Sequence, residues 1–283
     1  MPFIDSAMQS LARSSVLEVS ATDTAALTGS SKNPLLRRYG ARVRTDCLSH
    51  DSGLRVLLAT VAKAAARHDR SIRPLVSIWD SHHLRVSVRV QKSVKSANDL
   101  QSELGWRVFS PAEEEVRESI AAGLHHASTC EFLPMHCMLP LSSKVDRSDS
   151  RISGPLWVSA TGDSSAMRSM TEEAAMDYCG PEDISDALDW KPRELELERR
   201  RVARSVRNLA EEGSVIGTYH HIVVDDLASW LGTGAPPSPS KMVQILRDAG
   251  HRAGMAHYGN PSFRTDAPWE EVVEAAGSLQ PPM

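Results

Sequence analysis

Residues 54–90, LRVLLATVAKAAARHDRSIRPLVSIWDSHHLRVSVRV, decide the fold class. Leucine, valine and alanine recur at helical spacing from Leu54 to Ala65, which predicts an amphipathic helix. Two strand-forming runs follow, over 75–78 and 84–90, and the second alternates apolar with polar residues. A helix followed by two neighbouring strands is typical of a doubly wound α/β domain that finishes in an antiparallel hairpin.

The residues before this helix supply one further strand. Periodicity predicts a short helix over 4–11 and a strand over 16–20, followed by a loop rich in Gly, Ser, Asn and Pro over 29–34. Three strands are visible, whereas a doubly wound sheet has about six. Each βα unit takes roughly 30 residues, so we expect on the order of 100 residues of this domain to lie upstream of Met1.

Composition restricts the class of protein. The 283 residues are 41% hydrophobic and 24% charged, which excludes a disordered or collagen-like chain. The sequence predicts no membrane contact, because no apolar run approaches the ~18 residues of a membrane span and no signal peptide opens the chain. Four cysteines in so long a chain do not form a disulfide framework, and they favour a reducing, cytoplasmic location.

Positive charge is concentrated near the front of the chain. Residues 31–73 contain ten lysines and arginines against three aspartates, so this segment carries +7 while the remainder carries −11 of the net −4. Such a block suggests a localised contact with a polyanion, although a solvated surface gives the same pattern. Five of its basic residues lie between Lys32 and Arg44, around the predicted loop.

Residues 96–283 are predicted to form a second domain of helices and short strands. We expect a turn within 98–107, a helix over 112–124, a loop over 139–151, a strand over 154–158, short acidic helices over 165–178 and 181–188, and a long helix over 191–210. Arginines of the long helix either extend the polyanion surface or pair with its own glutamates. A helix at 224–231, a second one opened by Ser238 and Pro239, and a strand over 252–258 resemble a winged-helix module, and Trp269 opens a last helix.

Most chemical motifs are absent. Cys130 and Cys137 lie near several histidines, but no C-x₂-C pair occurs, and we predict no metal site. No glycine-rich phosphate loop and no G-x-S-x-G nucleophile motif is present. Asp23 follows a predicted strand, where α/β enzymes place functional groups, or it hydrogen-bonds its own loop.

Several short motifs, in one order along the chain, resemble the tRNA (guanine-26-N2)-dimethyltransferase family, which uses S-adenosylmethionine. They are Pro2 to Ala7, Ala21-Thr22-Asp23, Arg38-Tyr39-Gly40, His50-Asp51 with Arg55, Gly154-Pro155-Leu156-Trp157, His257-Tyr258 and Thr265-Asp266-Ala267-Pro268. The chain departs from the family pattern in lacking its C-x₂-C pairs between 100 and 153. Met1 also falls directly after the place of the family's catalytic D-P-F/Y-G motif.

The resemblance implies the fold: the C-terminal portion of a Rossmann-like class I methyltransferase domain over 1–95, followed by an α+β tRNA-binding domain with a winged-helix-like end over 96–283. It also implies methylation of a guanine N2 amine in tRNA, with S-adenosylmethionine as cofactor and no obligate protein partner. The catalytic motif is expected upstream of Met1, so no catalytic residue is assigned within the chain.

The residues assigned to binding follow from the same resemblance. Phe3 and Asp23 are expected to line the base or cofactor pocket, although Phe3 could instead belong to the core of the first helix. The residues expected to bind tRNA are Arg37, Arg38, Arg42, Arg44, His257 and Arg264. Two alternatives remain open: a non-catalytic tRNA-binding protein derived from the family, and a winged-helix regulator that binds DNA.

Overall fold

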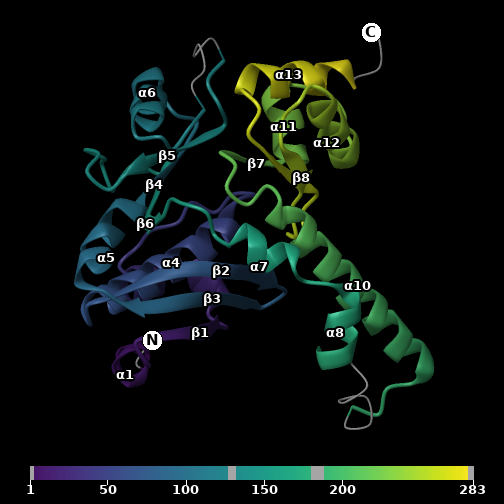
Figure 1. Cartoon of the computed structure of the whole chain (residues 1–283). Helices are drawn as coiled ribbons and strands as arrows, with labels where there is room; N and C mark the ends of the chain where they lie inside the picture. Colours follow the sequence, from purple (N-terminus) through teal and green to yellow (C-terminus); the bar gives the residue numbers. More distant parts are fainter. Residues whose placement is uncertain (1–2, 127–131, 180–187, 280–283) are drawn as a thin grey trace.

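The computed structural model describes residues 3–126, 132–179 and 188–279, which form an α/β fold of three small sheets (Figure 1). The first sheet contains β1 (Ser14–Ala21), β2 (Arg70–Asp80) and β3 (His83–Lys92) in the order β1-β3-β2. Because β3 is antiparallel to both neighbours, β1 and β2 run parallel to each other. The three predicted strands and their antiparallel hairpin are confirmed.

Helix α4 (Ser49–Ala66) is the central helix of the molecule. It packs against β2 and β3 on one side and against β6 (Ile152–Trp157) on the other. A helix covered on two sides must be apolar around most of its circumference, and small alanines allow the close approach. This explains why its sequence is so strongly apolar from Leu54 to Ala65.

The front of the chain adds three short helices to the first sheet. They are α1 (Ile4–Ser10), α2 (Thr24–Leu27) and α3 (Lys32–Tyr39). The prediction of a loop over 29–34 is therefore wrong for residues 32–34, which form the first turn of α3. Pro34 is tolerated there because the backbone N–H groups of the first turn have no partner within the helix. The basic residues that we expected around a loop begin on this helix.

The second sheet contains β4 (Leu104–Phe109), β5 (His136–Pro140) and β6 in the order β5-β4-β6. Around it lie α5 (Val94–Asp99), a 3₁₀ turn (Leu100–Glu103) and α6 (Glu113–Ala121). The helix over 112–124 and the strand over 154–158 are confirmed with shifted ends. The prediction missed β4, part of which it described as a turn, and β5, of which only the last two residues fell in the predicted loop.

The last part of the chain is mostly helical. It contains α7 (Ser164–Arg168), α8 (Glu172–Cys179), α10 (Pro192–Gly213), α11 (Val224–Leu231), α12 (Pro239–Asp248) and α13 (Trp269–Ser278). Strands β7 (His220–Val223), β8 (Ala253–Met255) and β9 (Ser262–Thr265) form the third sheet in the order β7-β9-β8. The helix predicted over 181–188 lies almost wholly outside the described residues.

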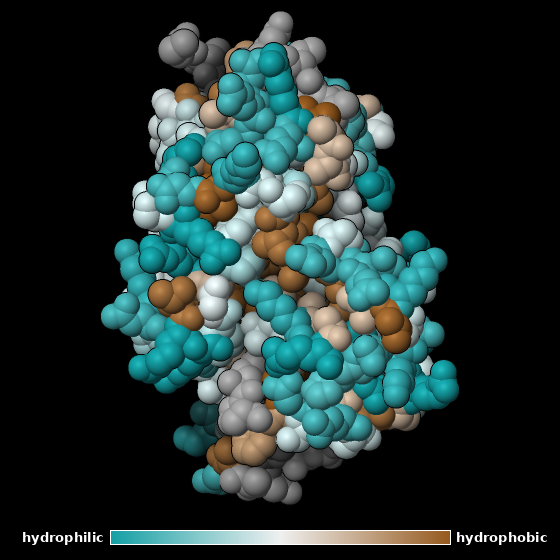
Figure 2. Space-filling model, turned by 90° about the vertical axis from the view of Figure 1, so that its left-hand side faces the viewer, coloured by the Kyte–Doolittle hydropathy of each residue, from teal (hydrophilic) through white to brown (hydrophobic). Residues whose placement is uncertain are grey.

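Helix α10 extends away from the body of the molecule, with α8 beside its outer part (Figure 1). The face that carries α5 and α6 is mostly hydrophilic, with small hydrophobic patches between polar side chains (Figure 2). Within the described ranges, every helix is too short or too polar to traverse a lipid bilayer.

Candidate functional site

The parallel strands β1 and β2 end on the same side of the first sheet, here called its carboxyl edge. Asp23 follows β1 at this edge, and Trp79 lies at the end of β2. Helix α4 begins here as well, because the ring of His50 in its first turn lies 3.9 Å from that of Trp79. In open α/β sheets this edge is where ligands bind.

A pocket of about 520 Å³ lies at this edge, beside β1. Phe3, Asp23, Arg38 and Tyr39 contribute to its wall, so the structure brings together both residues assigned to the base or cofactor pocket. Phe3 is 81% exposed, which rules out the reading of this ring as core of the first helix. The carboxylate of Asp23 forms an ion pair with Arg38. Burial, with the Asp23 charge nearby, raises the pKa of the Tyr39 hydroxyl.

The four arginines of the basic block have different surroundings. Arg37 and Arg42 are exposed, and Arg38 is exposed beside the pocket. Arg44 is half-buried, with a side chain that is 31% exposed: its guanidinium lies 4.0 Å from the ring centre of Phe109 and donates to the Ser150 carbonyl at 3.3 Å. The first three are therefore the most accessible of the four to an external polyanion, and Arg44 is partly accessible.

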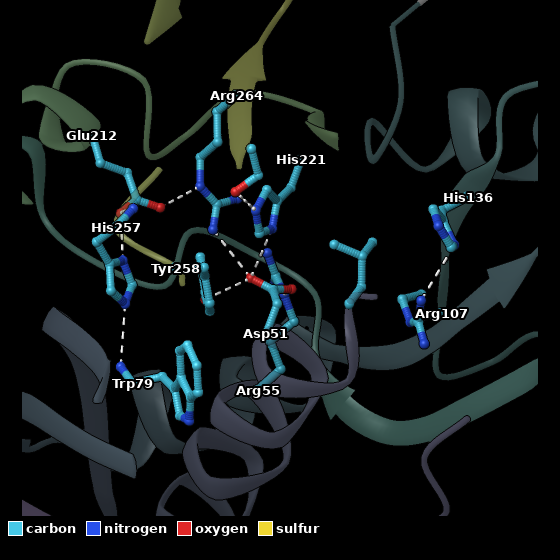
Figure 3. A network of polar contacts seen from close by, with 12 residues as sticks. Asp51, Arg55, Trp79, Arg107, His136, Glu212, His221, His257, Tyr258 and Arg264 are labelled. Carbon is cyan, nitrogen blue, oxygen red and sulfur yellow. Dashed lines mark hydrogen bonds and ion pairs between the residues drawn. The ribbon is translucent and has the colours of Figure 1, made fainter. Parts of the chain in front are cut away.

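A buried network of charged residues lies between α4 and the third sheet (Figure 3). Asp51 accepts from Arg55 Nε at 2.6 Å and from Arg264 Nη2 at 3.1 Å. Arg264 Nε in turn donates to Glu212 at 2.6 Å. Arg264 is 1% exposed, Asp51 2% and Glu212 0%, so these charges compensate one another without solvent.

Two neighbouring residues complete the network. The backbone N–H of Trp79 donates to His257 Nε2 at 3.1 Å, so this ring nitrogen is an acceptor and the ring proton lies on Nδ1. Nδ1 in turn donates to Glu212 at 2.5 Å. The hydroxyl of Tyr258 donates to Asp51 at 3.0 Å. The network thus ties α4 and β2 to α10, β9 and the turn after β8.

This burial corrects two of the sequence-based assignments. His257 and Arg264 were expected to bind tRNA, but their donors are engaged in internal bonds and their side chains are 6% and 2% exposed. A side chain without access to solvent cannot contact a phosphate backbone. Asp51, Arg55 and His257, which the family motifs singled out, do meet here, while Glu212 was not recognised because it belongs to none of those motifs.

The network predicts a specific acid sensitivity. Burial alone would raise the pKa of both carboxyl groups. Arg55, His221 and Arg264 instead hold the pKa of Asp51 well below its usual range. His257 and Arg264 do the same for the pKa of Glu212. Carboxylates with lowered folded-state pKa values stabilise the fold above their unfolded pKa, near 4, and that contribution is lost as pH falls further.

We therefore expect the free energy of unfolding, measured in urea, to fall progressively below about pH 4. The Glu212→Gln variant should start less stable and show a shallower fall over the same pH window, since one titrating group is gone. An unchanged slope in this variant would show that Glu212 does not contribute to the acid sensitivity.

A second cluster joins Cys47, His136 and Asp226, whose ligand atoms lie within 4.8 Å of one another. Arg107 Nη1 lies 3.2 Å from His136 Nδ1, and a guanidinium can only donate. Burial, with Arg107 nearby, lowers the pKa of His136 well below its ordinary value, so this imidazole is neutral and its proton lies on Nε2. Neither ring nitrogen is free to bind a metal while this contact persists, and we assign no metal to the cluster. Cys130 lies outside the described residues.

Comparison with known proteins gives consistent matches. The family model for N2,N2-dimethylguanosine tRNA methyltransferase matches residues 1–276. A tRNA (guanine(26)-N(2))-dimethyltransferase from Aeropyrum pernix is 30% identical over 280 residues, which cover 98% of this chain and 61% of that protein. The enzyme of the same name from Thermococcus kodakarensis is 29% identical, over 96% of this chain and 60% of that protein.

A solved structure has a similar fold. Trm1 from Pyrococcus horikoshii, in complex with S-adenosyl-L-methionine, has a TM-score of 0.70 at 20% sequence identity. The likeness covers 97% of this chain and 62% of that one. The chain therefore spans about three fifths of the length of the relatives that it matches.

Proposed function

The chain belongs to the N2,N2-dimethylguanosine tRNA methyltransferase family, and from this premise we propose that it takes part in methylating the N2 amine of a guanine in tRNA. The observation that carries the proposal is the family match over 1–276. The geometry supports it, because a pocket with an exposed aromatic ring and a carboxylate lies beside solvent-exposed arginines. A guanine in folded tRNA must leave its stack before its amine can react, and such a pocket suits a flipped base.

In this proposal the residues of the chain position the RNA. Phe3 offers a ring face for stacking, and Arg37, Arg38 and Arg42 offer charge to phosphates. The amine lone pair is delocalised into the ring, so catalysis needs a carboxylate aimed at its N–H groups. Arg38 already engages Asp23, and we assign no catalytic residue within the chain.

S-adenosyl-L-methionine, which the Pyrococcus protein binds, is proposed as the methyl donor. Nucleotide-type cofactors on α/β sheets need a glycine-bearing turn after a strand, so that backbone can approach them. The turns after the parallel strands β1 and β2 (Thr22-Asp23 and Ser81-His82) contain no glycine. These turns therefore do not fit the cofactor.

We further propose the domain division at residues 95 and 96. The order β1-β3-β2, with a hairpin strand between two parallel ones, supports reading residues 1–95 as the end of a methyltransferase sheet. The succession α10, β7, α11, α12, β8, β9 with sheet order β7-β9-β8 supports a winged-helix-like end for residues 96–283. The free thiols of Cys47 and Cys137 are in keeping with a cytoplasmic location.

A second candidate function is tRNA binding without catalysis, and the one observation that favours it is the absence of glycine from the two turns.

One experiment separates methylation from binding without catalysis. The protein is incubated with a tRNA transcript and S-adenosylmethionine, and nucleosides are analysed by mass spectrometry. N2-methylated guanosine at position 26 supports the enzyme; saturable tRNA binding without methylation supports the alternative; absence of both overturns the proposed function.

The Arg37→Ala/Arg42→Ala variant should bind tRNA roughly tenfold more weakly near 0.1 M salt, with a shallower dependence of affinity on salt. Each arginine that neutralises a phosphate contributes about 0.7–0.9 to the salt slope, so two should remove about 1.5. This pair leaves the Asp23–Arg38 contact intact. The matched control is Arg89→Ala/Arg117→Ala, which removes two exposed arginines elsewhere. Filter binding across a salt series measures both quantities, and equal slopes for the two variants would remove this segment from the RNA-binding surface.

A further inference from the structure

Helix α10 carries a second concentration of positive charge, outside the block at the front of the chain. Its middle, from residue 199 to residue 210, contains five arginines and no acidic residue. Arg200, Arg204 and Arg207 follow one another at spacings of four and three, so they share one face of the helix. Arg207 pairs with Glu172 of α8, whereas Arg200 and Arg204 are exposed to solvent.

A groove of about 700 Å³ runs between α10 and the end of β2. Arg201, Arg204 and Asn208 line it from the helix, and Trp79 and Ser81 line it from the sheet. A second hollow on α10 is lined by Arg200, Arg201 and Arg204 together with Trp190, Leu197, Glu194 and Glu198. Because both hollows share Arg201 and Arg204, they form one continuous surface along the helix, here called the α10 groove.

The arginines of the α10 groove are held only weakly. Arg200 pairs with Glu196 at 2.9 Å, and Arg201 with Glu198 at 3.1 Å and Asp80 at 3.2 Å, but the arginine side chains are 73% and 49% exposed. Exposed pairs of this kind contribute about 0–1 kcal/mol, so phosphate oxygens can replace the carboxylates. Arg204 forms no ion pair with any residue that the structure describes.

The α10 groove adjoins the Asp23 pocket. Ser81, on its wall, precedes His82 in the β2–β3 turn, and the His82 carbonyl accepts from Thr24 Oγ1 at 2.8 Å. Thr24 follows Asp23 directly. One turn of chain therefore separates the pocket from the groove, and a strand whose base enters the pocket can continue across this turn onto α10.

We propose that the α10 groove binds the sugar-phosphate backbone of tRNA next to the nucleotide held at the Asp23 pocket. Arg200, Arg201 and Arg204 contact phosphates, and the amide of Asn208 donates to a phosphate or ribose oxygen. This inference rests on the proposed function, and it adds a contact surface separate from Arg37 and Arg42. The carboxylates that line the same surface, on Asp80, Glu194 and Glu198, do not exclude this partner, because the pairs that Asp80 and Glu198 form with Arg201 are solvent-exposed and phosphates can replace them.

The test compares Arg200→Ala/Arg204→Ala with the control Arg89→Ala/Arg117→Ala in tRNA binding over a salt series. The α10 variant should lose roughly tenfold in affinity near 0.1 M salt, and its salt slope should fall by about 1.5. Wild-type affinity and slope in this variant, alongside normal tRNA binding by the wild type, would overturn the inference and leave the proposed function standing. Failure of the wild type itself to bind tRNA would overturn both.

A second readout locates the contact. A photoreactive amino acid at position 204 should crosslink tRNA within a few nucleotides of the modified guanine, whereas the same group at position 117 should not. Crosslinks from position 204 that map far from this guanine, or that are no stronger than those from position 117, would contradict the placement. A crosslink to an added acidic protein with none to tRNA would assign the surface to a protein partner instead and overturn the inference.

Discussion

Replacing Arg264 with methionine is expected to lower the free energy of unfolding by about 3–5 kcal/mol, more than any substitution of an exposed arginine in this chain. Arg264 is the one side chain that contacts both Asp51 and Glu212 among the residues described. Methionine fills much of the same volume but leaves two buried carboxylates facing one another with less compensation. Urea denaturation near pH 7 measures the loss.

The matched control is Arg252→Met. Arg252 forms an ion pair of similar length with Asp266, at 2.7 Å, but its side chain is 59% exposed. Solvent screens such a pair, so this variant should lose no more than about 1 kcal/mol. Similar losses of unfolding free energy in the two variants would show that burial does not determine how much the Arg264 ion pairs contribute to stability.

A triple variant separates charge from packing. Combining Arg264→Met with Asp51→Asn and Glu212→Gln removes the uncompensated charges together, and should recover part of the stability lost in the single variant. The network joins α4 and the end of β2 to α10 and β9, so it fixes the third sheet against the carboxyl end of β2, the strand parallel to β1, which Asp23 follows. We therefore expect the single variant also to weaken tRNA binding, without any direct contact to RNA.

The elements predicted from sequence are those whose burial follows a simple period. Strand β3 alternates buried and exposed residues from Leu84 to Val90, and α12 presents Met242, Val243 and Leu246 on one face, so local pattern and tertiary packing agree. Strand β4 is buried along nearly its whole length and contains both a glycine and an arginine, so its six residues show no alternation. Only the neighbours that cover both its faces make it a strand.

The same limit applies to the site. Asp23 and Phe3 could be assigned to one pocket because the resemblance to the family implied it, and the structure places both in the wall of that pocket. The role of Arg264 could not, because its partners lie 213 and 52 residues away. An arginine is exposed in most proteins, so a sequence without visible partners favours a surface contact. The buried carboxylates that reverse this expectation appear only in three dimensions.

Gly105 illustrates a position whose side chain the fold excludes, and Gly105→Ala is expected to lower the free energy of unfolding by about 3 kcal/mol or more. A Cβ at this position would lie 1.9 Å from the carbonyl oxygen of Leu139 and 2.8 Å from a methyl of Val158. The first of these atoms belongs to the backbone of the paired strand β5, so it cannot move aside without breaking the β4–β5 ladder.

Gly217→Ala is the control, because an added Cβ there meets no atom within 4 Å and its φ lies outside the left-handed range. This change should alter the free energy of unfolding by less than about 1 kcal/mol, in either direction. The comparison also tests how the second sheet supports the buried network, since β6, the other neighbour of β4, packs on α4, and its Trp157 carbonyl accepts from Arg55 at 3.0 Å. Unfolding of Gly105→Ala at the same urea concentration as Gly217→Ala would show that β4 and β5 do not approach each other this closely. It would also contradict the support that the second sheet gives to Asp51 through α4.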